Sequence, residues 1–266
     1  MESAVVIIAR QLEEGSTFTA NFQFVHCLFI LFMINLGRLT QQGEVIMSEN
    51  VKKQPVYSLS EELLNAISHG VGTLLSVAAL IVGVVCAALY SDIWCVVSMA
   101  IYGGTLIVLY CMSTLYHSLK PNKGKRVLRV LDHCSIFLLI AGTYTPYTLV
   151  SLRDTVGWIL FMIVWGAAIL GVTLNAVSIS RFKIFSMICY IAMGWVIIFA
   201  FKPLLDVMQT GGIVLLLAGG VAYTLGAVLY GLGKKRKNFH SVFHFFVLLG
   251  SILQYFIVLF YVVLPS

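Results

Sequence analysis

The chain has 266 residues, of which 60% are hydrophobic and 11% are charged, and its formal net charge is +6. A soluble domain carries about twice that fraction of charged residues, so the composition excludes an ordinary soluble protein. The positive charge does not indicate nucleic-acid binding, because the basic residues lie in short loops between apolar runs. In such loops they act as topology signals and as contacts to anionic lipids.

The first 46 residues differ in pattern from the rest of the chain. They contain one apolar stretch, FQFVHCLFILFMINL, which is short for a membrane span and precedes no small-residue cleavage site. One interpretation is an extra hydrophobic helix or a signal anchor. The other is that translation starts at Met47, because QQGEV back-translates to a purine-rich segment resembling a bacterial ribosome-binding site. We expect a start at Met47, with residues 1–46 as an N-terminal extension and 47–65 as a cytoplasmic segment.

Apolar runs close to the length that crosses a bilayer recur over residues 66–264. Short polar breaks separate them, and no soluble domain fits between them. The pattern predicts an all-α membrane protein, a seven-transmembrane helix bundle, because helices satisfy their own backbone groups in lipid. The expected spans are 66–90, 93–117, 131–152, 157–178, 183–201, 211–232 and 239–264.

The basic residues of the breaks are distributed very unequally between the two sides of the predicted bundle. One side holds thirteen Lys and Arg residues, whereas the opposite side holds only Arg153 and Lys202. The positive-inside rule therefore places the N-terminus in the cytoplasm and the C-terminus outside. The consistent alternation over all the breaks also supports the count of seven spans.

Three histidines are predicted to lie at the cytoplasmic ends of the spans. His240 and His244 are four residues apart and share a helix face, about 6 Å apart along the axis. His117 ends the second span at the same depth. Three neutral imidazoles can hold a zinc ion with a fourth position open to water, whose pKa then falls to about 7. We therefore predict His117, His240 and His244 as zinc ligands.

Two further side chains are candidates for catalysis beside this metal. Asp132 begins the third span and is suited to act as a general base, although a carboxylate at a helix N-terminus also stabilises the helix dipole. Ser113 shares a helix face with His117, one turn deeper, where its hydroxyl can bind water or a carbonyl. His133 points about 100° away from Asp132, so we do not assign it as a ligand.

A polar cluster precedes the first predicted span, in the segment EELLNAISHG. Glu61, Asn65 and His69 follow each other at four-residue spacing and therefore share one helix face. They are candidates for lining the same cytoplasmic cavity. The alternative is an amphipathic helix at the membrane interface, with His69 as a polar contact inside the bundle.

Four segments carry a resemblance to a known family: SLSEELLNAISHGVG, STLYHS, LDHCSIFLLIAGTYTPY and HSVFHFF. They resemble the bacterial hemolysin III proteins, which belong with the progestin and adipoQ receptor family, and the resemblance covers about residues 57–264. It implies seven helices with the N-terminus inside and a zinc ion on His117, His240 and His244. It also implies that Ser113 and Asp132 lie beside that metal.

The resemblance implies several functions that differ in class. The adiponectin receptors are linked to ceramide hydrolysis, and the wider superfamily includes alkaline ceramidases. The first hypothesis is therefore a zinc-dependent hydrolase in the bacterial inner membrane, with membrane lipids as substrates. The second is a membrane sensor or regulator with structural zinc, and the third is a cytolysin, which rests on the family name. A channel is disfavoured, because no second polar stripe is evident across the spans.

Overall fold

The computed structural model describes residues 57–232 and 238–264, and these residues form helices and contain no strand. The predicted extension over residues 1–46, the Met47 start and the basic segment 234–237 lie outside the described residues. Within the described residues, six helical segments are long and apolar enough to cross a membrane. The chain is therefore an all-α, multi-pass membrane protein.

The helical segments follow one another with short connections. In chain order they are α3 (Leu59–Tyr90), α4 (Ile93–Ser118), α5 (Lys123–Pro146), the π-helical η2 (Tyr147–Ser151), α6 (Gly157–Trp195), the 3-10 helix η3 (Val196–Ala200), α7 (Phe201–Val207), α8 (Thr210–Leu232), α9 (Phe239–Val258) and the π-helical η4 (Leu259–Val263).

Two helices begin earlier than hydropathy predicted, because local capping rather than apolar content fixes a helix start. The Ser58 hydroxyl accepts from the Glu61 backbone N–H while the Glu61 carboxylate reaches back, which makes a capping box for α3. The Asn122 side chain accepts from the Lys125 backbone N–H and caps α5, whose first residue, Lys123, lies eight residues before the predicted start of the third span. Asp132 therefore lies well inside α5, beyond the first turn where the helix dipole is felt.

Helix α6 is interrupted at Ser178. The backbone there has φ −165° and ψ 104°, which is extended rather than helical. The Ser178 hydroxyl accepts from the backbone N–H of Arg181, as a helix-capping serine does. The interruption therefore ends one helical run and starts another, close to the boundary expected between the fourth and fifth spans.

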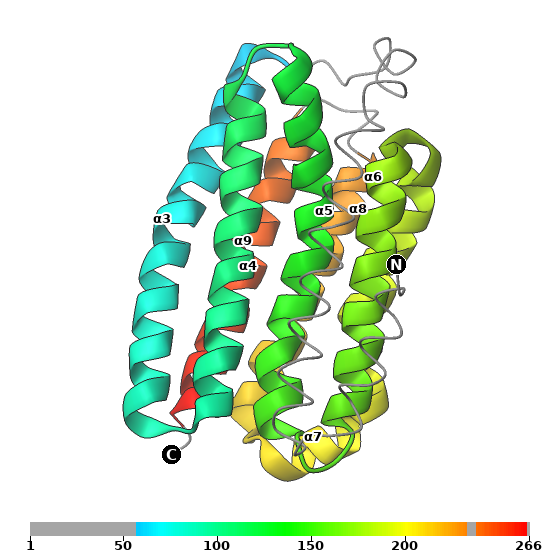
Figure 1. Cartoon of the computed structure of the whole chain (residues 1–266). Helices are drawn as coiled ribbons and strands as arrows, with labels where there is room; N and C mark the ends of the chain where they lie inside the picture. Colours follow the sequence, from blue (N-terminus) through cyan, green and yellow to red (C-terminus); the bar gives the residue numbers. More distant parts are fainter. Residues whose placement is uncertain (1–56, 233–237, 265–266) are drawn as a thin grey trace, which may run out of the picture. The chain divides into compact units, whose positions relative to one another are not determined.

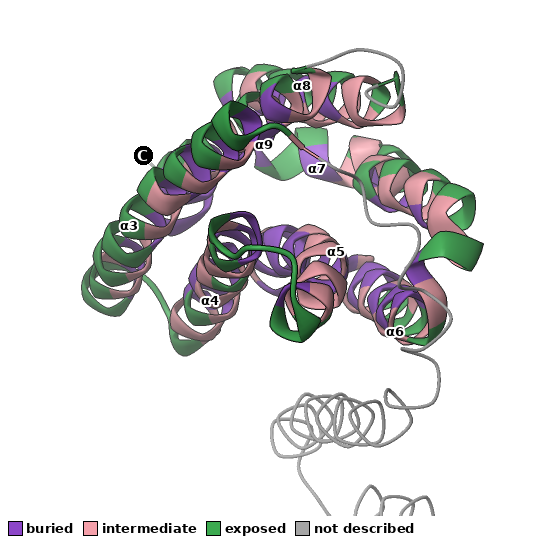
Figure 2. Cartoon of the chain, turned by 90° about the horizontal axis from the view of Figure 1, so that it is seen from above, coloured by how far each residue is buried: buried purple, intermediate pink, exposed green. Residues whose placement is uncertain are grey.

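The helices pack in a ring that brings distant parts of the sequence together. Figure 2, which looks down on the bundle, shows α9 between α3 and α8, and α5 between α4 and α6, in agreement with the packing contacts. Helices α3, α5 and α9 begin at the top of Figure 1, where α4 ends. We call this the histidine end, because His117 lies in the last turn of α4 and His240 in the first turn of α9.

The bundle also contains polar side chains far from the histidine end, and they hydrogen-bond to one another. The Tyr110 hydroxyl donates to Ser251 Oγ at 2.7 Å, and the Tyr147 hydroxyl donates to Gln254 Oε1 at 2.8 Å. The Tyr223 hydroxyl lies 2.8 Å from the same Ser251 Oγ. Ser251 and Gln254 lie on the face of α9 that carries the two histidines, so a polar stripe continues down this helix although the hydropathy pattern did not reveal one.

Candidate metal centre

Three imidazoles from two helices meet at the histidine end. His240 Nε2 lies 3.5 Å from His117 Nε2 and 3.2 Å from His244 Nε2. The three nitrogen atoms that these rings offer all lie within 4.8 Å of one another. His117 and His244 are buried, at 3% and 2% exposure. The four-residue spacing on α9 and the antiparallel arrival of α4 therefore bring together the histidines that the sequence singled out.

The chemistry of this cluster fits a bound metal ion. Glu62 Oε2 lies 2.7 Å from His117 Nδ1, which places the ring proton on Nδ1 and leaves the Nε2 lone pair pointing into the cluster. His240 Nε2 carries at most one proton, so it can donate to only one of its two neighbouring nitrogens. The other contact is then not a hydrogen bond, whereas a cation between the rings would be bound by the lone pairs of all three nitrogens. Zinc–nitrogen bonds of about 2.0–2.1 Å in a tetrahedron separate the nitrogens by about 3.3–3.4 Å, which is close to the two short distances, while the third pair, His117 and His244, lies within 4.8 Å.

Glu62 and Lys125 belong to this centre, although the sequence analysis did not select them. Lys125 Nζ donates to Glu62 Oε1 at 2.6 Å and to the carbonyl oxygen of Leu119 at 2.8 Å. Lys125 is 4% exposed, so its charge is neutralised inside the protein by Glu62. The sequence does indicate Glu62 as a candidate. It lies three residues before Asn65 and seven before His69, a spacing that places all three on one side of a helix.

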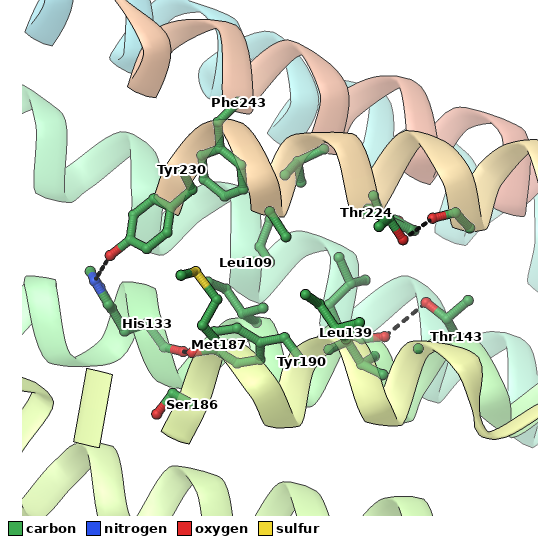
Figure 3. Close-up of a pocket in the computed structure, with 18 of the residues that line it drawn as sticks. Leu109, His133, Leu139, Thr143, Ser186, Met187, Tyr190, Thr224, Tyr230 and Phe243 are labelled. Atoms are coloured by element: carbon green, nitrogen blue, oxygen red, sulfur yellow. Dashed lines mark hydrogen bonds between the residues drawn. The ribbon is translucent and has the colours of Figure 1, made fainter. Parts of the chain in front are cut away.

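Asp132 and Ser113 lie beside the three imidazoles and line the same cavity. The Asp132 carboxylate interacts with the Ser113 hydroxyl and, through its charge, with His117. His133 Nδ1 lies 3.5 Å from Asp132 Oδ2, and His133 Nε2 lies 3.2 Å from the Tyr230 hydroxyl (Figure 3). His133 thus contacts the acid rather than the imidazole cluster. An acid, a hydroxyl and three imidazoles are in place together, while their roles in catalysis stay predictions.

The three residues predicted to share a face of α3 do so, but they make different contacts. Glu61 Oε1 accepts from the backbone N–H of Asn238 at 2.8 Å, so this carboxylate joins the starts of α3 and α9. His69 packs against His244 with ring centroids 3.9 Å apart and lines the cavity. Asn65 is fully buried at 0% exposure between these two levels.

Tyr57 covers the metal centre at the histidine end. Its ring stacks on His240 with a centroid distance of 4.7 Å and an interplanar angle of 19°, and it meets His117 edge-on at 5.7 Å. Burial raises the pKa of the Tyr57 phenol well above its usual value, so the ring stays neutral. Tyr57 precedes Ser58, the N-cap of α3, and the sequence pattern did not mark it as a site residue.

An elongated cavity of about 170 Å³ leads away from the imidazoles into the bundle. Its lining runs from His240 to Gln254 on α9, a distance of about 20 Å along the helix. The walls come mainly from α5, the part of α6 beyond Ser178, α8 and α9, and they are mostly apolar (Figure 3). Labelled examples are Leu109, Leu139, Met187, Tyr190 and Phe243. The cavity thus joins a polar, metal-binding end to a long apolar interior.

Comparison with known proteins gives consistent matches over nearly the whole described part of the chain. The profile of a family described as Haemolysin-III related matches residues 57–255. A protein named Hemolysin-3 from Bacillus cereus is 43% identical over 220 residues, covering 83% of this chain and 99% of that protein. A Hemolysin-3 homolog from Bacillus subtilis (strain 168) is 42% identical over 208 residues, covering 78% and 97% of the two chains.

A more distant match comes from animals. The human protein named Monocyte to macrophage differentiation factor is 26% identical over 210 residues, covering 74% of this chain and 82% of that protein. No solved structure gives a significant match to the chain.

Proposed function

This chain belongs to the haemolysin III family, and we propose that it is a zinc-dependent hydrolase that cleaves an amide or ester bond of a membrane lipid. The observation that carries the proposal is the cluster of three imidazoles at the mouth of an apolar cavity, with Asp132 and Ser113 beside it. A purely structural metal site has little need of an acid, a hydroxyl and an elongated apolar cavity at the same place.

The residues of the site divide the chemistry between them. When bound to His117, His240 and His244, zinc supplies Lewis-acid activation of water. Asp132 accepts a proton from the attacking water, whose oxygen forms a bond to the substrate carbonyl carbon. Ser113 donates a hydrogen bond that positions the carbonyl oxygen. The bond from carbon to nitrogen or oxygen then breaks, Asp132 returns the proton to the leaving amine or alcohol, and a carboxylic acid is the second product.

The cavity supports a lipid as the substrate. Its walls are mostly apolar and its lining extends about 20 Å from the imidazoles, so an acyl chain entering it would meet apolar side chains while its carbonyl group lies at the histidine end. The acyl chain of a membrane lipid already lies among apolar chains, so it can enter an apolar cavity without losing apolar contacts. The apolar walls therefore position the chain, while the polar end of the cavity provides the chemistry.

We further propose seven spans, with the N-terminus in the cytoplasm, in a bacterial inner membrane. The segment Gly157–Val207 has 51 residues, and a straight helix of that length would measure about 76 Å, more than twice the hydrocarbon thickness. The interruption at Ser178 supports two crossings in place of one. A C-terminal alkaline phosphatase fusion tests the orientation, because it is active only outside the cytoplasm, and an inactive but expressed fusion would contradict it.

The decisive experiment measures zinc and lipid turnover on the same purified protein in lipid vesicles. We expect about one zinc per chain in the wild type and release of free fatty acid from at least one member of a panel of ceramides and acyl phospholipids. The variant His240→Ala with His244→Ala is expected to lose both. His133→Ala is the matched control, because His133 lies outside the imidazole cluster, and it is expected to retain zinc.

Two outcomes would contradict the proposal in different ways. Unchanged zinc in the double variant would exclude the proposed ligands. Zinc that depends on the two histidines, without turnover of any lipid in the panel, would exclude the hydrolase and favour a sensor in which zinc joins α4 to α9. The name of the Bacillus cereus relative also suggests haemolysis; erythrocyte lysis that survives loss of all three histidines would favour a cytolysin.

A further inference from the structure

Buried polar atoms without hydrogen-bond partners are concentrated in one place. Among the described residues, nine buried side-chain nitrogen and oxygen atoms have no partner within the protein, and six of them belong to Asn65, His69, Ser241 and His244. All four residues are at most 3% exposed. We call these four residues the polar seam. An unpaired polar atom in a dry interior is unfavourable, so six in one cluster indicate that the seam binds a polar molecule.

The contacts between α3 and α9 set the register of the four seam residues. Glu61 bonds to the backbone of Asn238 at one end, and His69 packs on His244 two turns further along. The two helices run in the same direction between these contacts, with nearly constant offset, so Asn65 lies midway and faces Ser241. The same offset recurs deeper in the bundle, where the Tyr255 hydroxyl donates to the carbonyl oxygen of Ala79 at 3.0 Å.

Ser241 differs from other buried hydroxyl residues of these two helices. The hydroxyls of Ser68 and Ser76 donate to carbonyl oxygens of the preceding turn of their own helix, which satisfies them locally. The Ser241 hydroxyl makes no such bond, and neither nitrogen nor oxygen of the Asn65 amide has a partner. The Asn65 side-chain amide and the Ser241 hydroxyl are therefore both available to hydrogen-bond the same small polar molecule.

The seam has an opening that is separate from the lipid cavity. A surface groove of about 300 Å³ lies where α3 and α9 begin, and Glu61, Asn238 and Ser241 are among its lining residues. Ser241 thus belongs both to the groove and to the seam. At the other end of the seam, His244 is one of the three clustered imidazoles. The groove therefore lies at one end of the seam and the metal centre at the other.

We propose that the polar seam is the path by which water reaches the metal centre, independently of the cavity that takes the lipid. This inference rests on the proposed hydrolase, which consumes one water molecule in each turnover. A lipid that fills the apolar cavity closes that route to water, so the reaction needs a second entrance. Water in the seam would bond the Asn65 amide, the Ser241 hydroxyl and His244 Nδ1, and two to four polar partners are what a buried water requires.

Hydroxyl-radical footprinting of the full chain in lipid nanodiscs tests the path, because radicals made from bound water modify the side chains next to that water. We expect His69, at 3% exposure, to be modified at least about tenfold more than the fully buried Met99, although methionine is the more readily oxidised side chain. Asn65→Leu fills the seam with an apolar side chain and is expected to reduce His69 modification to the level of Met99. Ser241→Val, which blocks the seam nearer the groove, should give the same result if Asn65→Leu fails to fold.

Each outcome bears on the proposal. His69 modification at the level of Met99 in the wild type would overturn it. Modification unchanged in both variants would also overturn it, because water would then arrive through the lipid cavity. Footprinting needs no catalysis, so a protected His69 in an active hydrolase refutes the path alone. The two proposals can also fail the other way round. If the two variants protect His69 from modification but the protein hydrolyses no lipid, the hydrolase is refuted and the water path is supported.

Discussion

Polar side chains lie at both ends of the cavity, but they are hydrogen-bonded to one another at only one of the two ends. At the far end, the hydroxyls of Tyr110 and Tyr147 donate to Ser251 and Gln254 on the facing helix. At the histidine end, three imidazole nitrogens converge without enough protons to bond one another, and the neighbouring polar seam contains six unpaired atoms. Paired polar groups hold helices together, whereas converging unpaired ones indicate a ligand.

The difference between the two ends of α9 explains why a polar stripe on a helix is not by itself a functional site. His240, His244, Ser251 and Gln254 lie along one face of α9, and only the first two meet groups that cannot satisfy them. Gly219 on α8 makes the far pairing possible, because a Cβ there would come within 2.7 Å of Gln254 Nε2. The partner across the interface, rather than the polar residue itself, decides between stability and binding.

The largest effect is expected from Asp132, which we propose as the general base at the histidine end. Asp132→Asn removes the proton acceptor while keeping the size and most hydrogen bonds of the side chain. We expect fatty-acid release to fall by about 10²–10⁴-fold, the usual contribution of a general base. Zinc content should stay at the wild-type level, because Asp132 is not one of the three ligands. Loss of zinc together with activity would show that Asp132 binds the metal and would favour a closed structural site.

A smaller effect is expected from Glu62, which holds a ligand in place without touching the reacting atoms. Glu62→Gln weakens the bond to His117 Nδ1 and leaves the buried Lys125 without its counter-charge. We expect zinc affinity, measured by competition with a chelator, to fall by about 10–100-fold. Glu61→Gln is the matched control, because the Glu61 side chain bonds Ser58 and Asn238 and lies beside Glu62 in the same turn. Equal losses in both variants would mean that the start of α3, rather than the carboxylate–imidazole pair, supports the metal.

Much of the histidine end was predictable from the sequence, because its main residues obey helical spacing. His240 and His244 share a face for any helix that starts near residue 239, and His117 reaches the same depth if the spans alternate. The structure confirms that these three imidazoles come together. The zinc itself, its catalytic role, the seven spans and their orientation stay predictions.

Other parts of the site depend on contacts that spacing along the chain does not specify. Lys125 was interpreted as a topology signal, yet it is buried against Glu62, because α5 begins at the Asn122 cap and carries the first basic turn into the bundle. The pairing of Tyr147 with Gln254 joins residues 107 positions apart. Hydropathy hides such pairs, since one glutamine barely changes the mean of an apolar span.

The smallest effect is expected at the far end of the cavity, where the comparison predicts a loss of stability and no loss of metal. Tyr147→Phe removes the hydroxyl that donates to Gln254 Oε1 and leaves that oxygen unpaired. Hydrogen bonds between membrane helices contribute about 0.6 kcal/mol on average and at most about 1.7, so we expect a loss in this range in reversible unfolding from mixed micelles. Combining Tyr147→Phe with Gln254→Leu should cost less than the sum of the two single changes, because both remove the same bond. Zinc affinity should stay within about twofold of wild type in all three variants. A tenfold loss of zinc affinity would show that the far end of the cavity and the metal centre are energetically coupled, which would contradict the separate roles assigned to them.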